Sequence, residues 1–332
     1  MVNDVAYVGL GISAGQSLQG PELAPSLFYD FAISSELYLK SAKPKFRKQV
    51  FQENEFLQTR PSNRIHSRTD LTTQFLAPYQ HAYEFSQQSY QNNQFVVNVG
   101  GDHSVAISSV CAFLNRFPDG IVIWVDAHAD LNLPESSSTG NFHGMPLSLL
   151  LNIGEIGKSF VPWLKVPLRP ENLIYLGLRD IDPFEVHMLE KLNIQYFSAS
   201  DIHKTGIESV LKIISDRFSG RPIHVSVDVD GLDPIYTPST GLHIPNGLSV
   251  HDVCELMAWS SISGLQSMDI VEINPIVGFA NEVQTTFNSA AQILFSALSK
   301  QNLSYKNVEG GRHDWIHRAH QKHDTNAFEW CS

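Results

Sequence analysis

Short runs of β-branched and aromatic residues alternate along this chain with longer stretches whose apolar residues repeat at helical spacing. The strand-like runs cover residues 5–9, 95–99, 121–125, 173–176, 194–197, 223–227 and 266–271, and a weaker run covers 49–51. The helix-like stretches cover residues 71–91, 104–115, 183–191, 206–218, 249–260 and 283–298. Because strand–helix–strand units build parallel sheets, this alternation predicts a three-layer α/β/α fold with a mostly parallel sheet and helices on both faces.

The length of 332 residues fits one large α/β domain or two small domains. The chain has no internal repeat, no low-complexity tract and no linker rich in Pro, Gly or Ser. We therefore predict a single domain over residues 1–300. Within it, residues 41–69 are polar and weakly periodic, which is typical of loops.

The C-terminal part of the chain is polar and weakly periodic over residues 304–332, and we expect a polar tail over residues 301–332. Four histidines of this tail fall roughly on one helical face and could collect a metal ion. A solvated tail is the simpler interpretation. The four residues are His313, His317, His320 and His323.

Charge and composition exclude several classes of protein. Lys and Arg number 23 and Asp and Glu number 34, and the resulting charge of −11 would repel nucleic acid and anionic lipid surfaces. No apolar run approaches the ~18 residues that span a bilayer, so we expect no membrane segment. The N-terminus lacks the features of a signal peptide, which predicts a cytoplasmic protein. The cysteines are too scattered for a disulfide framework or a zinc site, and we expect buried or inert thiols at Cys111, Cys254 and Cys331.

A glycine-rich segment accompanies the first strand-like run. Gly9, Gly11 and Gly15 suggest a dinucleotide-binding loop, but the third glycine falls one position late for the G-x-G-x-x-G motif. No acidic residue closes a second strand at the expected distance. We therefore interpret the segment as an irregular loop in which glycine permits positive φ.

The strongest chemical signal follows the run at residues 121–125, which leads into Asp-Ala-His-Ala-Asp at 126–130. Alternate residues of an extended chain point to one side, so Asp126, His128 and Asp130 would converge. Unpaired buried carboxylates are costly, and a cation between these groups would offset that cost. Exposed residues that cap a loop are the alternative, but a second copy of the pattern argues against them.

Two further strand-like runs end in similar groups, because residues 223–227 lead into Asp228 and Asp230 and residues 95–99 lead towards His103. In a parallel sheet the ligand crevice lies beyond the carboxyl ends of the strands, so these side chains should reach one edge. Two imidazoles and four carboxylates are about right for two ions. Oxygen-rich ligation suits Mn²⁺, and the ligand types are also compatible with Co²⁺, Fe²⁺, Ni²⁺ or Zn²⁺. The expected metal ligands are His103, Asp126, His128, Asp130, Asp228 and Asp230.

Five motifs occur in order: Gly-Gly-Asp-His-Ser (100–104), Asp-Ala-His-Ala-Asp (126–130), Thr-Gly-Asn-Phe-His-Gly (139–144), Ser-Val-Asp-Val-Asp-Gly-Leu-Asp-Pro (226–234) and Asp-Ile-Val-Glu-Ile-Asn-Pro (269–275). Together they resemble the arginase branch of the ureohydrolase family. The resemblance implies an open eight-stranded sheet, two Mn²⁺ ions per subunit and a homotrimer or homohexamer. It also implies hydrolysis of L-arginine to L-ornithine and urea.

The chemistry of individual residues agrees with this resemblance. Two metals about 3.5–4 Å apart can share a water and supply a metal-bridging hydroxide that attacks the guanidinium carbon. The cationic guanidinium needs an anionic partner, and our candidate is Glu272, just past a strand-like run. His143 resembles the family's proton-shuttle histidine and would protonate the leaving amine. The resemblance further implies that Asp130 bridges the metals and accepts the hydroxide proton.

Substrate choice depends on the residues that meet the amino-acid end of the substrate. Asn132, Thr139 and Asn141 match the family's carboxylate-binding loop. Asp182 and Glu185 match its binders of the amino group. These residues favour L-arginine over agmatine, which has no carboxylate.

Three departures from the family pattern keep other hypotheses open. Thr139 stands where serine is common, Phe142 stands where leucine is common, and Leu242 with His243 replaces the usual Thr-Pro. Leu242 removes a hydroxyl near Glu272, which leaves another ureohydrolase, acting on agmatine or guanidinobutyrate, as an alternative. A non-catalytic metal- or ligand-binding relative is a third hypothesis, although such a protein has no need for a proton shuttle.

Overall fold

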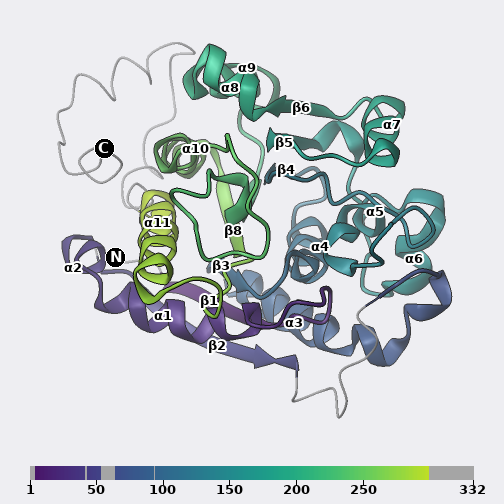
Figure 1. Ribbon diagram of the computed structural model, residues 1–332, viewed down its shortest axis with the longest axis horizontal. Helices are drawn as coiled ribbons and strands as arrows, with labels where there is room; N and C mark the ends of the chain where they lie inside the picture. Colours follow the sequence, from purple (N-terminus) through teal and green to yellow (C-terminus); the bar gives the residue numbers. More distant parts are fainter. Residues whose placement is uncertain (1–3, 42, 54–63, 93, 299–332) are drawn as a thin grey trace.

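One sheet of eight strands forms the centre of the computed structural model, which describes residues 4–41, 43–53, 64–92 and 94–298 (Figure 1). The strand order is β2-β1-β3-β8-β7-β4-β5-β6, and each neighbouring pair is parallel. The predicted open eight-stranded sheet is therefore confirmed. The strands are β1 (Asp4–Gly11), β2 (Lys45–Gln52), β3 (Phe95–Gly100), β4 (Ile121–Val125), β5 (Leu173–Leu178), β6 (Gln195–Ser198), β7 (Ile223–Asp228) and β8 (Leu265–Val271).

Helices cover both faces of the sheet and complete the three predicted layers (Figure 1). Alternate residues of a strand enter opposite layers, so that Tyr7 packs in one apolar cluster and Val8 in the other. The first layer contains α1 (Ala24–Ser34), α2 (Glu36–Lys40), α8 (Ala199–Thr205), α9 (Ile207–Phe218), α10 (Val250–Ser263) and α11 (Ala280–Leu298). The second layer contains α3 (Thr73–Gln91), α4 (Ala106–Arg116), α5 (Pro146–Leu150), α6 (Ile156–Phe160) and α7 (Pro183–Lys191).

Each strand-like run and each helix-like stretch of the sequence coincides with a strand or helix of the structure. The sequence prediction misses α1, α2, α5, α6 and α8. Most of these helices are too short to show a full amphipathic period. The residues of α5 are buried on all sides, so its sequence has no polar face that would mark a helix.

The prediction of loops over residues 41–69 is wrong for part of that region. β2 occupies Lys45–Gln52 and pairs with β1 along its whole length, and a 3-10 helix spans Arg68–Asp70. β2 is an edge strand, and its first residues are largely exposed. Edge strands need no continuous apolar run, which explains why the sequence signal was confined to residues 49–51.

The segment of Gly9, Gly11 and Gly15 does not adopt positive φ, so that expectation is wrong. Gly9 and Gly11 are residues of β1 itself. Glycine at position 15 allows the backbone to lie close to the side chain of Asp102, because a Cβ at this position would lie 2.7 Å from Asp102 Oδ1. The backbone N–H of Gly15 instead donates a hydrogen bond to Asp102 Oδ2 (2.7 Å), which fastens this loop to the residues that follow β3.

Cys111 and Cys254 are buried, as expected. Cys331, the predicted tail over residues 301–332 and its four histidines lie outside the described residues. In the part of the chain that the structure describes, no helix combines the length and the apolar character needed to cross a membrane.

Candidate active site

The candidate site lies where four neighbouring strands end. β3, β8, β7 and β4 are adjacent in the sheet, and each leads into a segment that carries predicted site residues. The residues after β3 include His103, those after β4 include Asp126, those at the end of β7 include Asp228, and Glu272 follows β8. Parallel strands bring these carboxyl ends to one edge, so the predicted convergence of the motifs is confirmed.

Two groups of side chains could each hold a metal ion. One consists of His103, Asp126 and Asp228, and the other of Asp126, His128 and Asp230. Within each group the potential ligand atoms lie within 4.8 Å of one another, and Asp126 belongs to both. The sixth expected ligand, Asp130, places its Oδ2 atom 3.1 Å from His103 Nδ1. The structure therefore gathers all six expected metal ligands.

The polar atoms of this cluster are not satisfied by one another. His103 Nδ1 lies 3.0 Å from Asp126 Oδ2 and 3.1 Å from both Asp130 Oδ2 and Asp228 Oδ2. Even so, neither His103 Nδ1 nor Asp130 Oδ2 has a hydrogen-bond partner of acceptable geometry among the described residues. One ring nitrogen cannot serve three carboxylates, whereas a cation with imidazole and carboxylate ligands can. The residues present thus fit a bound divalent metal.

The pKa values of the clustered carboxyl groups also favour a bound metal ion. Burial and then the Asp230 carboxylate raise the pKa of Asp228, and burial followed by Asp126 raises the pKa of Asp130 to about 6. Burial also disfavours ionised Asp126, but the neighbouring imidazoles outweigh it and hold the pKa of that carboxyl below its usual value. Without a cation, four adjacent carboxylates cannot all ionise at low cost, and bound metal would remove that conflict.

The ring of His103 is fixed from two sides. Its Nε2 atom lies 2.9 Å from Ser226 Oγ, and the ring stacks on Trp124 with centroids 4.0 Å apart and an interplanar angle of 7°. The indole Nε1 of Trp124 donates to Asp126 Oδ2 (2.9 Å). These contacts direct His103 Nδ1 towards the carboxylates and limit the rotation of a candidate ligand.

Glu272 is buried, and both of its carboxylate oxygens are hydrogen-bonded. Oε1 accepts from His143 Nδ1 (2.8 Å) and from the backbone N–H of His103 (2.9 Å), while Oε2 accepts from Gln16 Nε2 (2.7 Å). Burial lowers the pKa of His143, but the Glu272 carboxylate outweighs burial and raises that pKa to about 9. The structure therefore couples two predicted catalytic residues directly.

Two predicted catalytic residues have strained backbone. Asp130 has φ of 50° and Glu272 has φ of 64°, in the left-handed region that non-glycine residues rarely adopt. Such conformations persist where the surrounding structure fixes them and are found often at active sites. In Glu272 the backbone N–H donates to the carbonyl of Gly101 (2.9 Å), which fixes the turn after β8.

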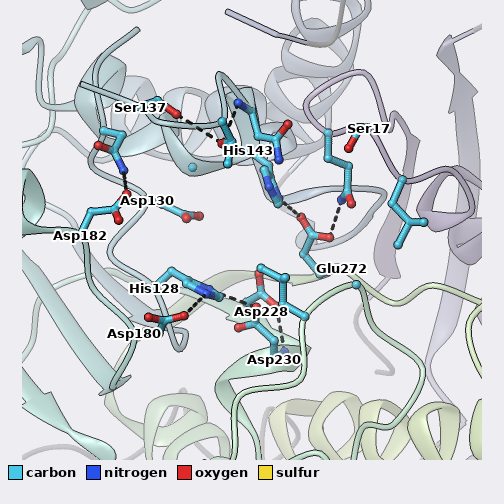
Figure 2. Close-up of a pocket in the computed structure, with 18 of the residues that line it drawn as sticks. Ser17, His128, Asp130, Ser137, His143, Asp180, Asp182, Asp228, Asp230 and Glu272 are labelled. Atoms are coloured by element: carbon cyan, nitrogen blue, oxygen red, sulfur yellow. Dashed lines mark hydrogen bonds and ion pairs between the residues drawn. The ribbon is translucent and has the colours of Figure 1, made fainter. Parts of the chain in front are cut away.

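A pocket of about 300 Å³ adjoins the metal-ligand cluster, and four of the expected ligands line it: His128, Asp130, Asp228 and Asp230. Figure 2 shows His143 and Glu272 pointing towards each other on one side of it, while Asp182 and Ser137 lie on the other side. Many of the lining side chains are acidic, so the pocket favours a cationic ligand. All five predicted substrate-binding residues line it: Asn132, Thr139, Asn141, Asp182 and Glu185.

Four of these five residues already form side-chain hydrogen bonds in the described structure, and Thr139 Oγ1 accepts one from the backbone N–H of Asn141 (3.2 Å). Asn132 donates from Nδ2 to Asp182 Oδ2 (2.8 Å) and accepts at Oδ1 from Ser136 Oγ (2.9 Å). Glu185 accepts backbone hydrogen bonds from Leu131 (2.8 Å) and Asp182 (3.0 Å), the latter as part of the capping box of α7. Burial raises the pKa of Glu185 to about 7. Their contacts hold Asp182 and the loop after β4 in place.

The sequence prediction overlooked several residues of the pocket wall. Asp180 places Oδ2 3.6 Å from His128 Nε2, and its position two residues before Asp182, in the loop between β5 and α7, could have marked it as a site residue. Gln16 reaches Glu272 across 256 residues of sequence, for which no local pattern exists. The other overlooked lining residues are Ser17, Leu18, Ser137, Ser138, Gly144, Thr240 and Gly241.

Comparison with known proteins agrees with this geometry. The model of the Arginase family matches residues 3–299. An arginase of Schizosaccharomyces pombe is 33% identical over 310 residues, which cover 90% of this chain and 93% of the yeast protein. The structure of Entamoeba histolytica arginase in complex with L-ornithine is 25% identical, covering 89% of this chain and 98% of that chain, with a TM-score of 0.76.

A third comparison shows the fold alone. The agmatine ureohydrolase of Thermoplasma volcanium is 20% identical, covering 91% of this chain and 90% of that chain, with a TM-score of 0.65. The same architecture therefore accompanies more than one named activity. The family match and the identity to the yeast protein are more specific, and they show that the chain belongs to the arginase family of metal-dependent amidinohydrolases.

Proposed function

We propose that this protein hydrolyses L-arginine to L-ornithine and urea with two Mn²⁺ ions per subunit. One observation carries the proposal: the buried carboxylate of Glu272 and the acidic ligand cluster occupy one part of a pocket that has amide, hydroxyl and carboxylate groups at its other end. A cationic guanidinium and an amino-acid head group match these two ends. The ligand set of oxygen and imidazole groups supports Mn²⁺.

The metal ions would be held by the six expected ligands, with Asp126 shared between the two groups. Divalent cations bound there lower the pKa of water and so supply a nucleophile near neutral pH. Asp130 accepts a proton in this proposal, which is supported by its Oδ2 atom, since that atom lies 3.1 Å from His103 Nδ1 and lacks a hydrogen-bond partner in the described part of the chain. The surrounding structure holds the backbone of Asp130 at a left-handed φ of 50°.

Glu272 binds the guanidinium group in this proposal. The turn after β8 and Gln16 Nε2 orient its carboxylate, which remains ionised because the His143 imidazolium offsets burial and lowers the pKa of Glu272. His143 then donates a proton to the amine that leaves as ornithine. At a pKa of about 9 it carries this proton at neutral pH, as a general acid requires.

The opposite end of the pocket binds the α-ammonium and α-carboxylate groups of the substrate in this proposal. Asp182 is an anion that suits the α-ammonium group, while Asn141, Thr139 and the neighbouring Ser137 supply donors for the α-carboxylate. The loop that carries these donors is fixed by Ile65, whose backbone N–H donates to the carbonyl of Gly140 (2.6 Å). This end favours arginine over guanidino compounds that lack a carboxylate.

A second candidate function is hydrolysis of agmatine or guanidinobutyrate by the same residues. The observation that favours it is Leu242, an apolar side chain of 44% exposure that lines the pocket beside Thr240 and Gly241. Thr240 Oγ1 donates to the backbone carbonyl of Glu272 (2.9 Å), so this apolar wall adjoins the proposed guanidinium site. Leu242 supplies no polar group there.

The decisive experiment measures urea release from L-arginine, agmatine and guanidinobutyrate in parallel, with Mn²⁺-loaded protein and an EDTA-stripped control. Metal-dependent urea from arginine, with the highest kcat/KM of the three substrates, is the expected result. A higher kcat/KM for agmatine or guanidinobutyrate would transfer the function to the second candidate. No urea from any of them would favour a non-catalytic metal- or ligand-binding protein.

We propose a homotrimer or homohexamer, a cytoplasmic protein and a single domain over residues 1–300. Sedimentation equilibrium of the full chain at several concentrations tests the assembly, and a monomer throughout would contradict it. Limited proteolysis tests the domain boundary, since a single domain should first be cleaved beyond residue 300.

A further inference from the structure

The side chain of Arg179 is bound almost entirely to backbone carbonyl groups. It follows β5 and is partly buried. Its Nη2 atom donates to the carbonyls of Asp230 (2.6 Å), Ile244 (2.7 Å) and Leu232 (3.1 Å), and its Nη1 atom donates to those of Gly177 and Gly231 (both 3.1 Å). Its Nε atom lies 3.2 Å from the carbonyls of Ile244 and Pro245. A single guanidinium thus donates hydrogen bonds to three chain segments, at residue 177, residues 230–232 and residues 244–245.

The backbone around Arg179 holds the other ligand-bearing turn. The N–H groups of Arg179 (2.9 Å) and Asp180 (3.0 Å) both donate to the carbonyl of Ala127, between two expected metal ligands. The two turns also touch each other, since the N–H of Ala127 donates to Asp230 Oδ1 (3.3 Å). Arg179 therefore joins the turn that carries Asp126 and His128 to the turn that carries Asp230.

These two turns together supply one of the two metal-ligand groups, the one made of Asp126, His128 and Asp230. The other group shares Asp126 with the first and adds Asp228 and His103, and the ring of His103 is held by Ser226 and Trp124. Among the hydrogen bonds of the described residues, none joins Arg179 to the segment of His103. Arg179 thus binds the backbone carbonyl of Asp230, which belongs to the first group alone, and in the described part of the chain it has no hydrogen bond to His103 or Asp228, which belong to the second group alone.

From this asymmetry we infer that Arg179 is a positioning residue for the cation held by Asp126, His128 and Asp230, and has much less effect on the cation beside His103. The inference rests on the two-metal site of the proposed function. A guanidinium presents five N–H donors in a planar fork, whereas a lysine ammonium presents three donors on a flexible stem. Lysine would keep the charge but could not hold all these carbonyls in one arrangement.

The test compares R179K and R179M with wild type and with R221K as a matched control. Arg221 also binds a backbone carbonyl, because its Nε atom donates to that of Asp119 (2.8 Å). Asp119 precedes β4 and lies at the opposite end of that strand from the site. Each full-length protein is stripped with EDTA and titrated with Mn²⁺ alone. Bound metal per subunit is measured by elemental analysis after equilibrium dialysis, and circular dichroism checks that each variant is folded.

We expect wild type and R221K to bind two Mn²⁺ per subunit, while R179K binds one with unchanged affinity and the other about 10–100-fold more weakly. R179M should weaken the same ion at least as much. Equal weakening of both ions, or two Mn²⁺ bound by R179K with wild-type affinities, would overturn the inference. R179K remains informative if R179M does not fold.

A pair of double variants identifies which ion is affected. In an H128A background the ion on that side is already lost, so adding R179K should leave the remaining Mn²⁺ affinity unchanged. In an H103A background, R179K should weaken the remaining ion by the same factor as in wild type. The reverse pattern would refute the assignment. Two bound Mn²⁺ in wild type without urea release would overturn the proposed function but not this inference, whereas a wild type that binds fewer than two would overturn both.

Discussion

His143 Nδ1 donates to Glu272 Oε1 over 2.8 Å, so the proposed proton donor and the proposed guanidinium anchor share one buried ion pair. Each group changes the acidity of the other: the carboxylate raises the pKa of His143 despite burial, and the imidazolium lowers the pKa of Glu272 despite burial. A substitution at either position should therefore alter both substrate binding and proton transfer.

Glu272→Gln should lower the pKa of His143 from about 9, because the carboxylate that opposes burial most strongly would be lost and only the weaker influence of Asp102 and Asp130 would remain. Loss of the anionic anchor should also lower kcat/KM for arginine by at least about 30-fold, equivalent to about 2 kcal/mol. NMR titration of the metal-free protein measures the pKa, and urea release measures the rate. A histidine that still titrates near 9 would disprove the coupling.

His143→Ala should lower kcat by about 10²–10⁴-fold while two Mn²⁺ remain bound, since general acid catalysis is lost and no expected metal ligand is removed. Steady-state kinetics and elemental analysis on the same sample check both statements. His251→Ala, at an exposed position of α10, is the control and should retain wild-type kcat. A normal rate in the His143 variant would exclude the proton-shuttle role.

His128→Ala and Asp230→Ala should each cost one Mn²⁺ and most of kcat, because both residues belong to the same metal-ligand group. The bound metal is counted by elemental analysis after dialysis. Asp216→Ala, which removes an exposed carboxylate on α9, should change neither value. Two tightly bound ions in the His128 variant would contradict the ligand assignment.

Asn141→Ala should raise KM for L-arginine by about tenfold or more, the equivalent of losing a hydrogen bond to a charged group. Agmatine serves as the internal control, because it has no carboxylate for this side chain to meet. Its KM should therefore change little. Equal effects on the two substrates would show that the loop with Asn141 does not bind the carboxylate.

The metal-free protein should lose stability as pH rises from about 4.5 to 7, in part through Glu185. Burial raises the pKa of this carboxyl in the folded state to about 7 from an ordinary value of 4.5, so the folded protein holds a proton that the unfolded chain has released. Glu185→Gln should flatten the dependence of Tm on pH over this interval. An unchanged slope would show that Glu185 is not the group responsible.

The sequence was most informative where strands are buried on both faces. β4 is a continuous apolar run that leads into alternating Asp and His residues, and β7 has apolar residues at alternate positions and leads into two alternating Asp residues, so both the strands and the site could be predicted. β2 lies at the sheet edge, and its polar sequence concealed most of its length. Its pairing with β1 depends on main-chain hydrogen bonds, which any side chain permits.

Contacts between distant segments could not be predicted from local patterns. The hydrogen bond from Gln16 to Glu272, and the contacts of Arg179 with the turn at Asp230, depend on the order of strands in the sheet. A single sequence shows which residues follow each strand but not which strands are neighbours. Glu185 shows a related difficulty, because the motif suggested a substrate ligand whereas the structure adds a helix-capping role.

The left-handed backbone of Asp130 and Glu272 has a consequence for engineering. Outside its own sheet, a loop with these sequences would relax to ordinary φ values, because the left-handed conformation costs about 1–2 kcal/mol per residue. Grafting the short motifs onto another scaffold would therefore transfer the residue types without their directions. A functional transplant would have to include the ends of β4 and β8 and the loop at Gly101 that accepts the N–H of Glu272.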